Sequence, residues 1–164
     1  MSRNAEGYRD PTAGAAISHA DKDAERERIA LENGKIKIVL RIPPSVNHMY
    51  ITTRSGKRAP STHTNAWMTE AKIIIRSAMR MHKPRPWRMI EKGRKVIMEV
   101  TVYWAAANGR DMNNIHKLLC DAPEGELYEN DSQVLVRDMD YSVVGKRAAR
   151  VEIVVYDREL EEQP

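Results

Sequence analysis

Apolar and polar residues alternate along four segments of the chain, a pattern typical of half-buried β-strands. These segments span residues 36–42, 96–104, 132–141 and 149–156. Pro43-Pro44 stops the first strand, and Gly145-Lys146 predicts a turn between the last two.

Two other segments place apolar residues at the three- and four-residue spacing of a helix. Thr64-Asn65 is expected to cap a helix over residues 66–81, with a buried stripe made of Trp67, Ala71, Ile74, Ile75 and Ala78. A second helix is expected to begin near Asn113, and its core-facing residues are Ile115, Leu118, Leu119 and Ala122.

The elements follow the order β-α-β-α-β-β, which predicts a single α+β domain: a mixed four-stranded sheet with two main helices on one face. We expect this domain to span residues 35–157. Residues 1–34 are polar and predict an extension, partly disordered or with a short helix over residues 24–31, and residues 158–164 predict an acidic tail.

Composition narrows the class of protein. Apolar residues make up 41% of the chain but aromatic residues only 5%, so the core must rest on aliphatic side chains and Met. The sequence shows neither a membrane span nor a signal peptide, and we therefore expect a cytoplasmic protein without a membrane partner. Cys120, the single cysteine, excludes an internal disulfide and is either a small core residue or a nucleophile.

Charge is distributed unevenly along the chain. Residues 41–95 hold 13 basic and 2 acidic residues, whereas residues 111–140 hold 2 basic and 8 acidic residues. This arrangement favours a protein that holds a polyanion with one region and a divalent cation with the other. The alternative is a basic face that serves only solubility.

Basic residues in two places are candidates for DNA contacts. The long polar connection over residues 45–62 carries Arg54, Lys57 and Arg58, which suit phosphate contacts; the alternative is a solvated loop. Lys72 and Arg76 lie off the buried stripe of the first helix, where they either flank DNA or form an ordinary wet face. Residues 87–95 form a further basic connector.

Acids and amides gather where the second helix begins. Asp111 precedes that helix, Asn113 begins it, and Asp131 precedes the third strand. The fold can therefore bring their side-chain oxygens together as ligands for Mg²⁺. A divalent ion there could bind a phosphate and stabilise a phosphodiester transition state, with Lys117 neutralising charge. The alternative for these residues is capping and turn chemistry.

A series of motifs in a fixed order carries a resemblance to a known family. Residues 110–121, Arg-Asp-Met-Asn-Asn-Ile-His-Lys-Leu-Leu-Cys-Asp, are followed by residues 127–134, Leu-Tyr-Glu-Asn-Asp-Ser-Gln-Val. Together with Pro43-Pro-Ser-Val-Asn-His-Met-Tyr50, they closely resemble the RusA family of Holliday junction resolvases over residues 36–156.

The resemblance implies a small homodimeric endonuclease of phage or prophage type that needs Mg²⁺, with Mn²⁺ as a substitute, and nicks four-way DNA junctions symmetrically. Asp111, Asn113 and Asp131 match the metal-binding and catalytic positions, Lys117 matches the essential lysine, and Asn114 and Asp121 match supporting positions. The DNA-binding set comprises Asn47, Tyr50, Arg54, Lys57, Arg58, Lys72, Arg76 and Arg110.

The sequence departs from the family at two positions, because Asn113 and Asn130 stand where the family has aspartates. An amide oxygen can coordinate Mg²⁺ but brings no negative charge, so metal binding and cleavage should weaken. Two alternatives follow: a junction-binding or architectural protein that does not cut, and a structural or protein-interaction domain. The sequence has no phosphate-binding loop for ATP and no zinc-ligand spacing.

Overall fold

A computed structural model describes residues 34–107 and 111–161 of the protein. The predicted extension before residue 34, including its short helix, lies outside these ranges, as do the last three residues of the predicted tail. Among the residues that the structure describes, no helix combines the length and the apolar character needed to cross a bilayer.

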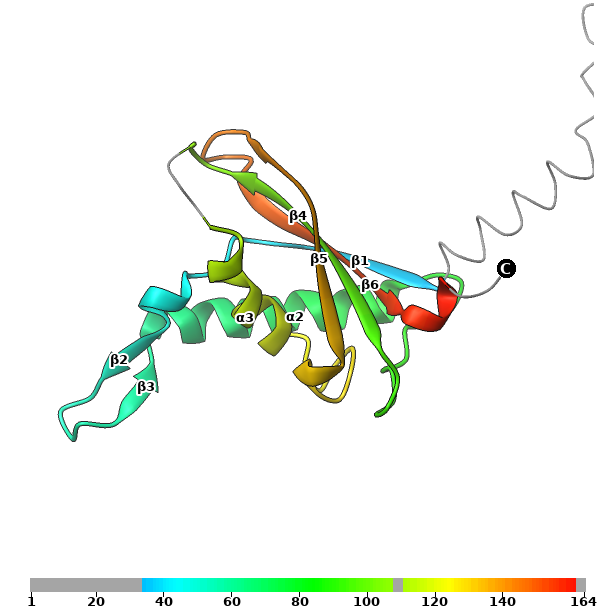
Figure 1. Ribbon diagram of the computed structural model, residues 1–164, viewed down its shortest axis with the longest axis horizontal. Coiled ribbons are helices and arrows are strands. Elements are labelled where there is room, and N and C mark those ends of the chain that lie inside the picture. Colours follow the sequence, from blue (N-terminus) through cyan, green and yellow to red (C-terminus); the bar gives the residue numbers. More distant parts are fainter. Residues whose placement is uncertain (1–33, 108–110, 162–164) are drawn as a thin grey trace, which may run out of the picture.

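The core of the fold is one mixed sheet of four strands in the order β1-β6-β4-β5. β6 runs antiparallel to both of its neighbours, and β4 and β5 are parallel. Two helices, α2 and α3, lie on one side of this sheet (Figure 1), which confirms the predicted α+β fold. The strands are β1 (Lys35–Leu40), β4 (Val96–Trp104), β5 (Val134–Val143) and β6 (Arg150–Asp157), and the helices are α2 (Thr62–Met81) and α3 (Asn113–Asp121).

One face of the sheet is covered by the helices and is apolar. Alternate residues of β1, β4 and β6, such as Ile38, Val100 and Ile153, are almost fully buried against Ile75 of α2 and Leu119 of α3. Because residues i and i+2 of a strand share a face, this alternation fixes which side of each strand the helices cover.

The other face of the sheet is only partly open, since Ile97 and Tyr156 are buried there, and it carries ion pairs. Lys37 of β1 contacts Glu152 of β6 at 2.6 Å, and Arg150 binds the same carboxylate at 2.8 Å while stacking on Tyr103. The Lys37–Glu152 and Arg150–Tyr103 contacts join neighbouring strands, and the Arg150–Glu152 pair lies within β6, so polar residues on this face pair with one another as well as with water.

The predicted connection over residues 45–62 is not an unstructured loop, which corrects the sequence interpretation. It contains a short hairpin made of β2 (Tyr50–Thr52) and β3 (Arg58–Pro60), which projects from the body of the molecule (Figure 1). α2 also begins earlier than predicted, because Ser61 caps it by accepting a hydrogen bond from the Thr64 N–H. Thr64 itself is buried.

The last two strands differ slightly from the prediction. Residues 131–133 form a 3-10 turn, so β5 starts at Val134. The turn predicted at Gly145-Lys146 exists, since the Ala148 N–H donates to the Gly145 carbonyl at 3.2 Å. However, β5 and β6 do not pair with each other, because β4 lies between them.

The covered face of α2 should carry much of the stability of the fold. Ile75 is 0% exposed, whereas Ile73, on the same helix, is 61% exposed. We expect Ile75→Ala to lower the free energy of unfolding by about 2–5 kcal/mol, because it removes buried methyl groups and leaves a cavity. Urea unfolding checks this, with Ile73→Ala as the matched control, which should change stability by less than about 0.5 kcal/mol.

Candidate active site and nucleic-acid interface

α3 presents the predicted polar residues on the side opposite the core. Ile115, Leu118 and Leu119 are buried, as predicted, and this orientation leaves Lys117 exposed and Asp121 half-buried at its end. Asp111 lies just before the helix, and its carboxylate accepts a hydrogen bond from the Asn113 N–H at 2.9 Å. This bond between residues two apart is the turn chemistry that the sequence left open for Asp111, while Met112 occupies the cap position of α3.

Lys117 lies between acidic groups. Its Nζ donates to Asp121 Oδ1 at 3.1 Å. The pKa of Lys117 is raised, chiefly by this hydrogen bond; partial burial opposes the rise, and the charges of Asp121, Asp131 and Tyr50 add to it. The lysine stays a cation at neutral pH, which is the state that can neutralise a phosphate.

Asp131 is fixed by the loop that leads to it. Glu124 Oε2 accepts a hydrogen bond from the Asp131 N–H at 3.1 Å. Asn130 caps the following 3-10 turn: its side chain accepts from the Ser132 N–H, and Gln133 Oε1 accepts from its backbone N–H at 2.9 Å. Asparagine is among the favoured cap residues, so Asn130 stabilises this turn.

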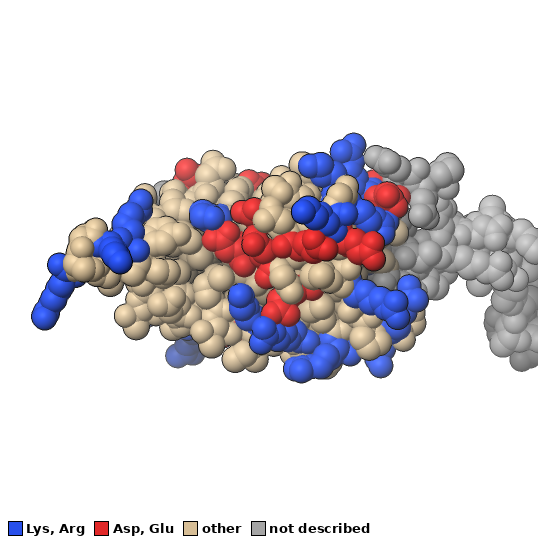
Figure 2. All heavy atoms as spheres, turned by 90° about the horizontal axis from the view of Figure 1, so that it is seen from below, with Lys and Arg blue, Asp and Glu red and all other residues tan. Residues whose placement is uncertain are grey.

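The hairpin lies next to this acidic group. Arg54 and Lys57 are exposed at its outer end, and the Arg58 guanidinium stacks on the Tyr50 ring, 4.9 Å from the ring centroid. Tyr50 in turn acts electrostatically on Lys117. Figure 2 shows acidic side chains in a band across the middle of this side of the molecule, with basic side chains at the projecting end and along both flanks of the band.

Other candidate DNA-binding residues have different surroundings. Arg76 of α2 binds Glu126 at 2.6 Å, so its charge is already paired within the protein. Lys72 is half-buried on the same helix, and Asn47 is exposed in a 3-10 turn before the hairpin. Arg110 lies outside the described residues.

Cys120 is a packing residue. Its side chain is partly buried against the core, and burial raises the pKa of the thiol to about 11, with the charges of Asp121 and Asp131 adding to the rise. The Tyr128 hydroxyl donates to the Cys120 carbonyl at 2.7 Å. A thiol with so high a pKa is a poor nucleophile at neutral pH.

The donor atoms suit a hard cation. Asp111, Asn113 and Asp131 offer only oxygen ligands, and Mg²⁺ is commonly held by one or two carboxylates while it keeps several waters. Within residues 34–107 and 111–161, no three His, Cys, Asp or Glu side chains come together as a metal cluster. These oxygen ligands are of the kind that Mg²⁺ prefers, but Asn113 is a neutral amide, so the set carries little negative charge.

Sequence reasoning missed two residues that organise the site, Glu124 and Gln133. Glu124 gave no signal, since it is one of several acids in its loop. Gln133 could have been found from the spacing Asn130-Asp-Ser-Gln133, which matches a capping box.

These observations define a small α+β protein in which a lysine, held among carboxylates, lies beside a basic hairpin. The family model described as "Endodeoxyribonuclease RusA" matches residues 40–156, and the chain belongs to the RusA family. Membership implies Holliday junction resolvase activity in DNA recombination. A comparison with curated proteins found no significant match.

The charge environment of Lys117 can be tested directly. Asp121→Asn removes the hydrogen-bonded carboxylate that contributes most to the raised pKa, so the pKa of Lys117 should fall towards its ordinary value. NMR titration of the lysine side-chain signals measures the change. Asp138→Asn is the control, because Asp138 pairs with His116 instead; an equal fall in both variants would contradict the assignment.

Proposed function

We propose that this protein is a Mg²⁺-dependent endonuclease that binds four-way DNA junctions and resolves them by paired nicks. The observation that carries the proposal is Lys117, exposed on α3 and held by a hydrogen bond to Asp121. A cation at this place can neutralise a phosphate of the DNA that the basic hairpin holds.

In this proposal Asp111, Asn113 and Asp131 hold the metal ion, which when bound supplies Lewis-acid stabilisation of the phosphate. Lys117 provides fixed positive charge for the reacting phosphate or the leaving oxygen. Asp121 holds the lysine in place through its hydrogen bond. Asn114, half-buried on the same helix, is a supporting residue.

The proposed assembly is a homodimer, because a four-way junction has two equivalent strands to cut and a twofold protein offers two equivalent sites. We place its action in the cytoplasm of a bacterial or phage-infected cell. The separation of basic and acidic segments in the sequence supports a DNA partner.

The second candidate function is junction binding without cleavage. Asn113 favours it, because an amide replaces a charged ligand and lowers the electrostatic attraction for Mg²⁺. Retention of Asp111, Lys117 and Asp131 favours the nuclease, since a binding protein needs no acids near the DNA phosphates.

Cleavage of a labelled four-way junction distinguishes the two functions. We expect Asn113→Asp to raise the cleavage rate at limiting Mg²⁺ by about 10- to 100-fold, since weakening a metal site costs this order of activity. Paired nicks by the unmodified chain would establish a working nuclease, and nicks only after the exchange would establish the binding protein.

A control variant keeps this experiment specific to the acids. Asp131→Asn, placed in the Asn113→Asp background, should abolish cutting while junction affinity is retained. Loss of binding and cutting together would count against the proposed metal site.

The hairpin can be tested through the salt dependence of binding. Arg54→Ala with Lys57→Ala should reduce the slope of log K against log salt by about 0.9 for each phosphate that is no longer neutralised. Arg58 is retained because it stacks on Tyr50. The matched control is Lys146→Ala with Arg147→Ala, two exposed residues of the turn between β5 and β6. Equal slopes for both pairs would remove the hairpin from the interface.

A further inference from the structure

Only two buried residues in the described part of the chain are polar, Thr64 and Gln133. A buried polar group is costly unless it is hydrogen-bonded, so the partners of these two side chains are informative. Thr64 Oγ1 donates to the Met49 carbonyl at 3.1 Å, immediately before β2. It therefore fastens the base of the hairpin to α2.

Gln133 likewise joins two segments that are far apart in the sequence. Its Nε2 donates to the carbonyl oxygens of Glu91 at 2.8 Å and Arg94 at 3.0 Å. Its Oε1 accepts from the Asn130 N–H in the turn that holds Asp131. One buried amide thus ties the segment over residues 91–95 to the loop of a proposed metal ligand.

The segment over residues 91–95, which we call the second arm, is a basic turn at the surface. Gly93 adopts φ +90°, and the Arg94 N–H donates to the Glu91 carbonyl at 3.3 Å, so the chain reverses there. Lys92 and Lys95 are exposed, and neither forms an ion pair within residues 34–107 and 111–161.

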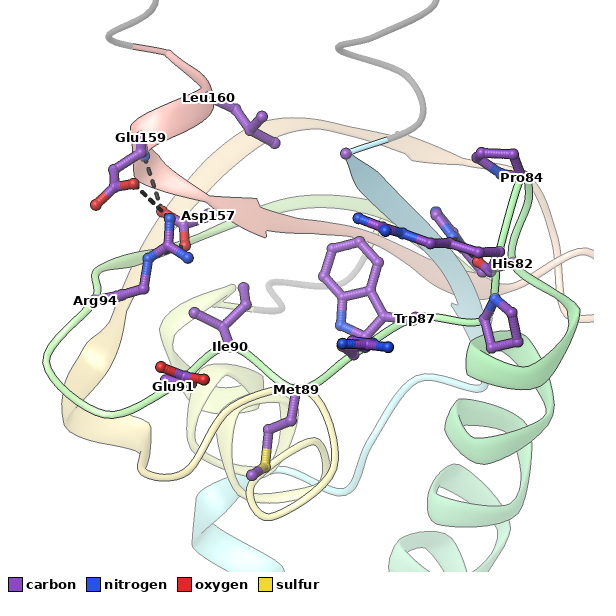
Figure 3. Close-up of a pocket in the computed structure, with 14 residues that line it drawn as sticks. His82, Pro84, Trp87, Met89, Ile90, Glu91, Arg94, Asp157, Glu159 and Leu160 are labelled. Atoms are coloured by element: carbon purple, nitrogen blue, oxygen red, sulfur yellow. Dashed lines mark hydrogen bonds and ion pairs between the residues drawn. The ribbon is translucent and has the colours of Figure 1, made fainter.

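Arg94, unlike the two lysines, forms ion pairs within the part of the chain that the structure describes. Its Nε contacts Asp157 Oδ2 at 2.8 Å, and its guanidinium also binds Glu159. Figure 3 shows Arg94 beside Asp157 and Glu159 at the rim of a hollow of 670 Å³, which is lined by other parts of the connector after α2. Arg94 therefore anchors the second arm to the end of β6.

The second arm faces the acidic segment over residues 122–133, which contains Asp131, across a hollow of 620 Å³. Residues 92–95 line one side, and Glu129, Asn130, Ser132 and Gln133 line the other. The arm is also joined to this loop at its start, where the Ile90 N–H donates to the Leu127 carbonyl at 2.8 Å. The arm therefore keeps a fixed position relative to Asp131.

We propose that residues 91–95 form a second DNA-binding arm in which Lys92 and Lys95 contact the phosphate backbone, and that Gln133 positions this arm relative to Asp131. The inference rests on the proposed junction binding. The first arm is the hairpin with Arg54 and Lys57, tied to the fold by Thr64. Two exposed lysines on a fixed turn suit phosphates, which need positive charge but no base-reading geometry.

The test compares the salt dependence of four-way junction binding by the full chain. Lys92→Ala with Lys95→Ala should lower the slope by about 0.9 for each phosphate that is no longer neutralised, hence by up to about 2. Lys146→Ala with Arg147→Ala is again the control and should leave the slope unchanged. An unchanged slope in the Lys92 and Lys95 variant would overturn the inference.

Gln133→Glu tests the positioning role separately. A glutamate can still accept from the Asn130 N–H, but it cannot donate to the two carbonyl oxygens of the arm. We expect the slope to fall as in the lysine variant, with no further fall when the two changes are combined. Full additivity of the two effects would contradict the coupling.

Two further outcomes remain distinguishable. If the unmodified chain binds the junction without a steep salt dependence, the proposed function and this inference both fail. If it binds steeply while the lysine variant matches the control, only the second arm fails. A thermal melt shows whether the Gln133→Glu variant is folded. If it is not, the variant with Lys92→Ala and Lys95→Ala still tests the second arm, because these two exposed side chains support no buried contact.

Discussion

The packing of α3 against the sheet is the constraint on which the site depends. The helix has nine residues, and three of them, Ile115, Leu118 and Leu119, must be buried. With 3.6 residues per turn, this requirement leaves one orientation about the helix axis, and it places Lys117 outward. The position of the charged group is thus set by apolar contacts on the opposite side of the same helix.

Fixed positive charge and reduced negative charge coexist at this site. Lys117 is hydrogen-bonded to Asp121 and lies within the electrostatic influence of Asp131, while Asn113, a proposed metal ligand, is a neutral amide. A site with fewer carboxylates repels DNA phosphates less but attracts a divalent cation less strongly. In the proposed function, DNA binding and cleavage therefore make opposite demands on residue 113.

Much of the fold was predictable because the decisive signals are local. The bounds of β4 agree with the alternation of residues 96–104, and α3 begins at Asn113 as its apolar spacing indicates. The hairpin was missed because its strands have three residues each, and those of β2 are all exposed, so no alternation arises. The ties made by Thr64 and Gln133 join distant segments, and a single sequence does not encode such pairings in its periodicity.

The strand order has a consequence for how the molecule is made. β6 lies between β1 and β4, so the strand synthesised after all the others occupies an inner place in the sheet. Lys35 pairs with Tyr156, and this contact closes nearly the whole domain as a loop. During synthesis on the ribosome, β1 has no strand to pair with until residues 150–157 have emerged. The acidic site and the basic hairpin can therefore be held together in one nuclease fold only after the domain has been fully translated.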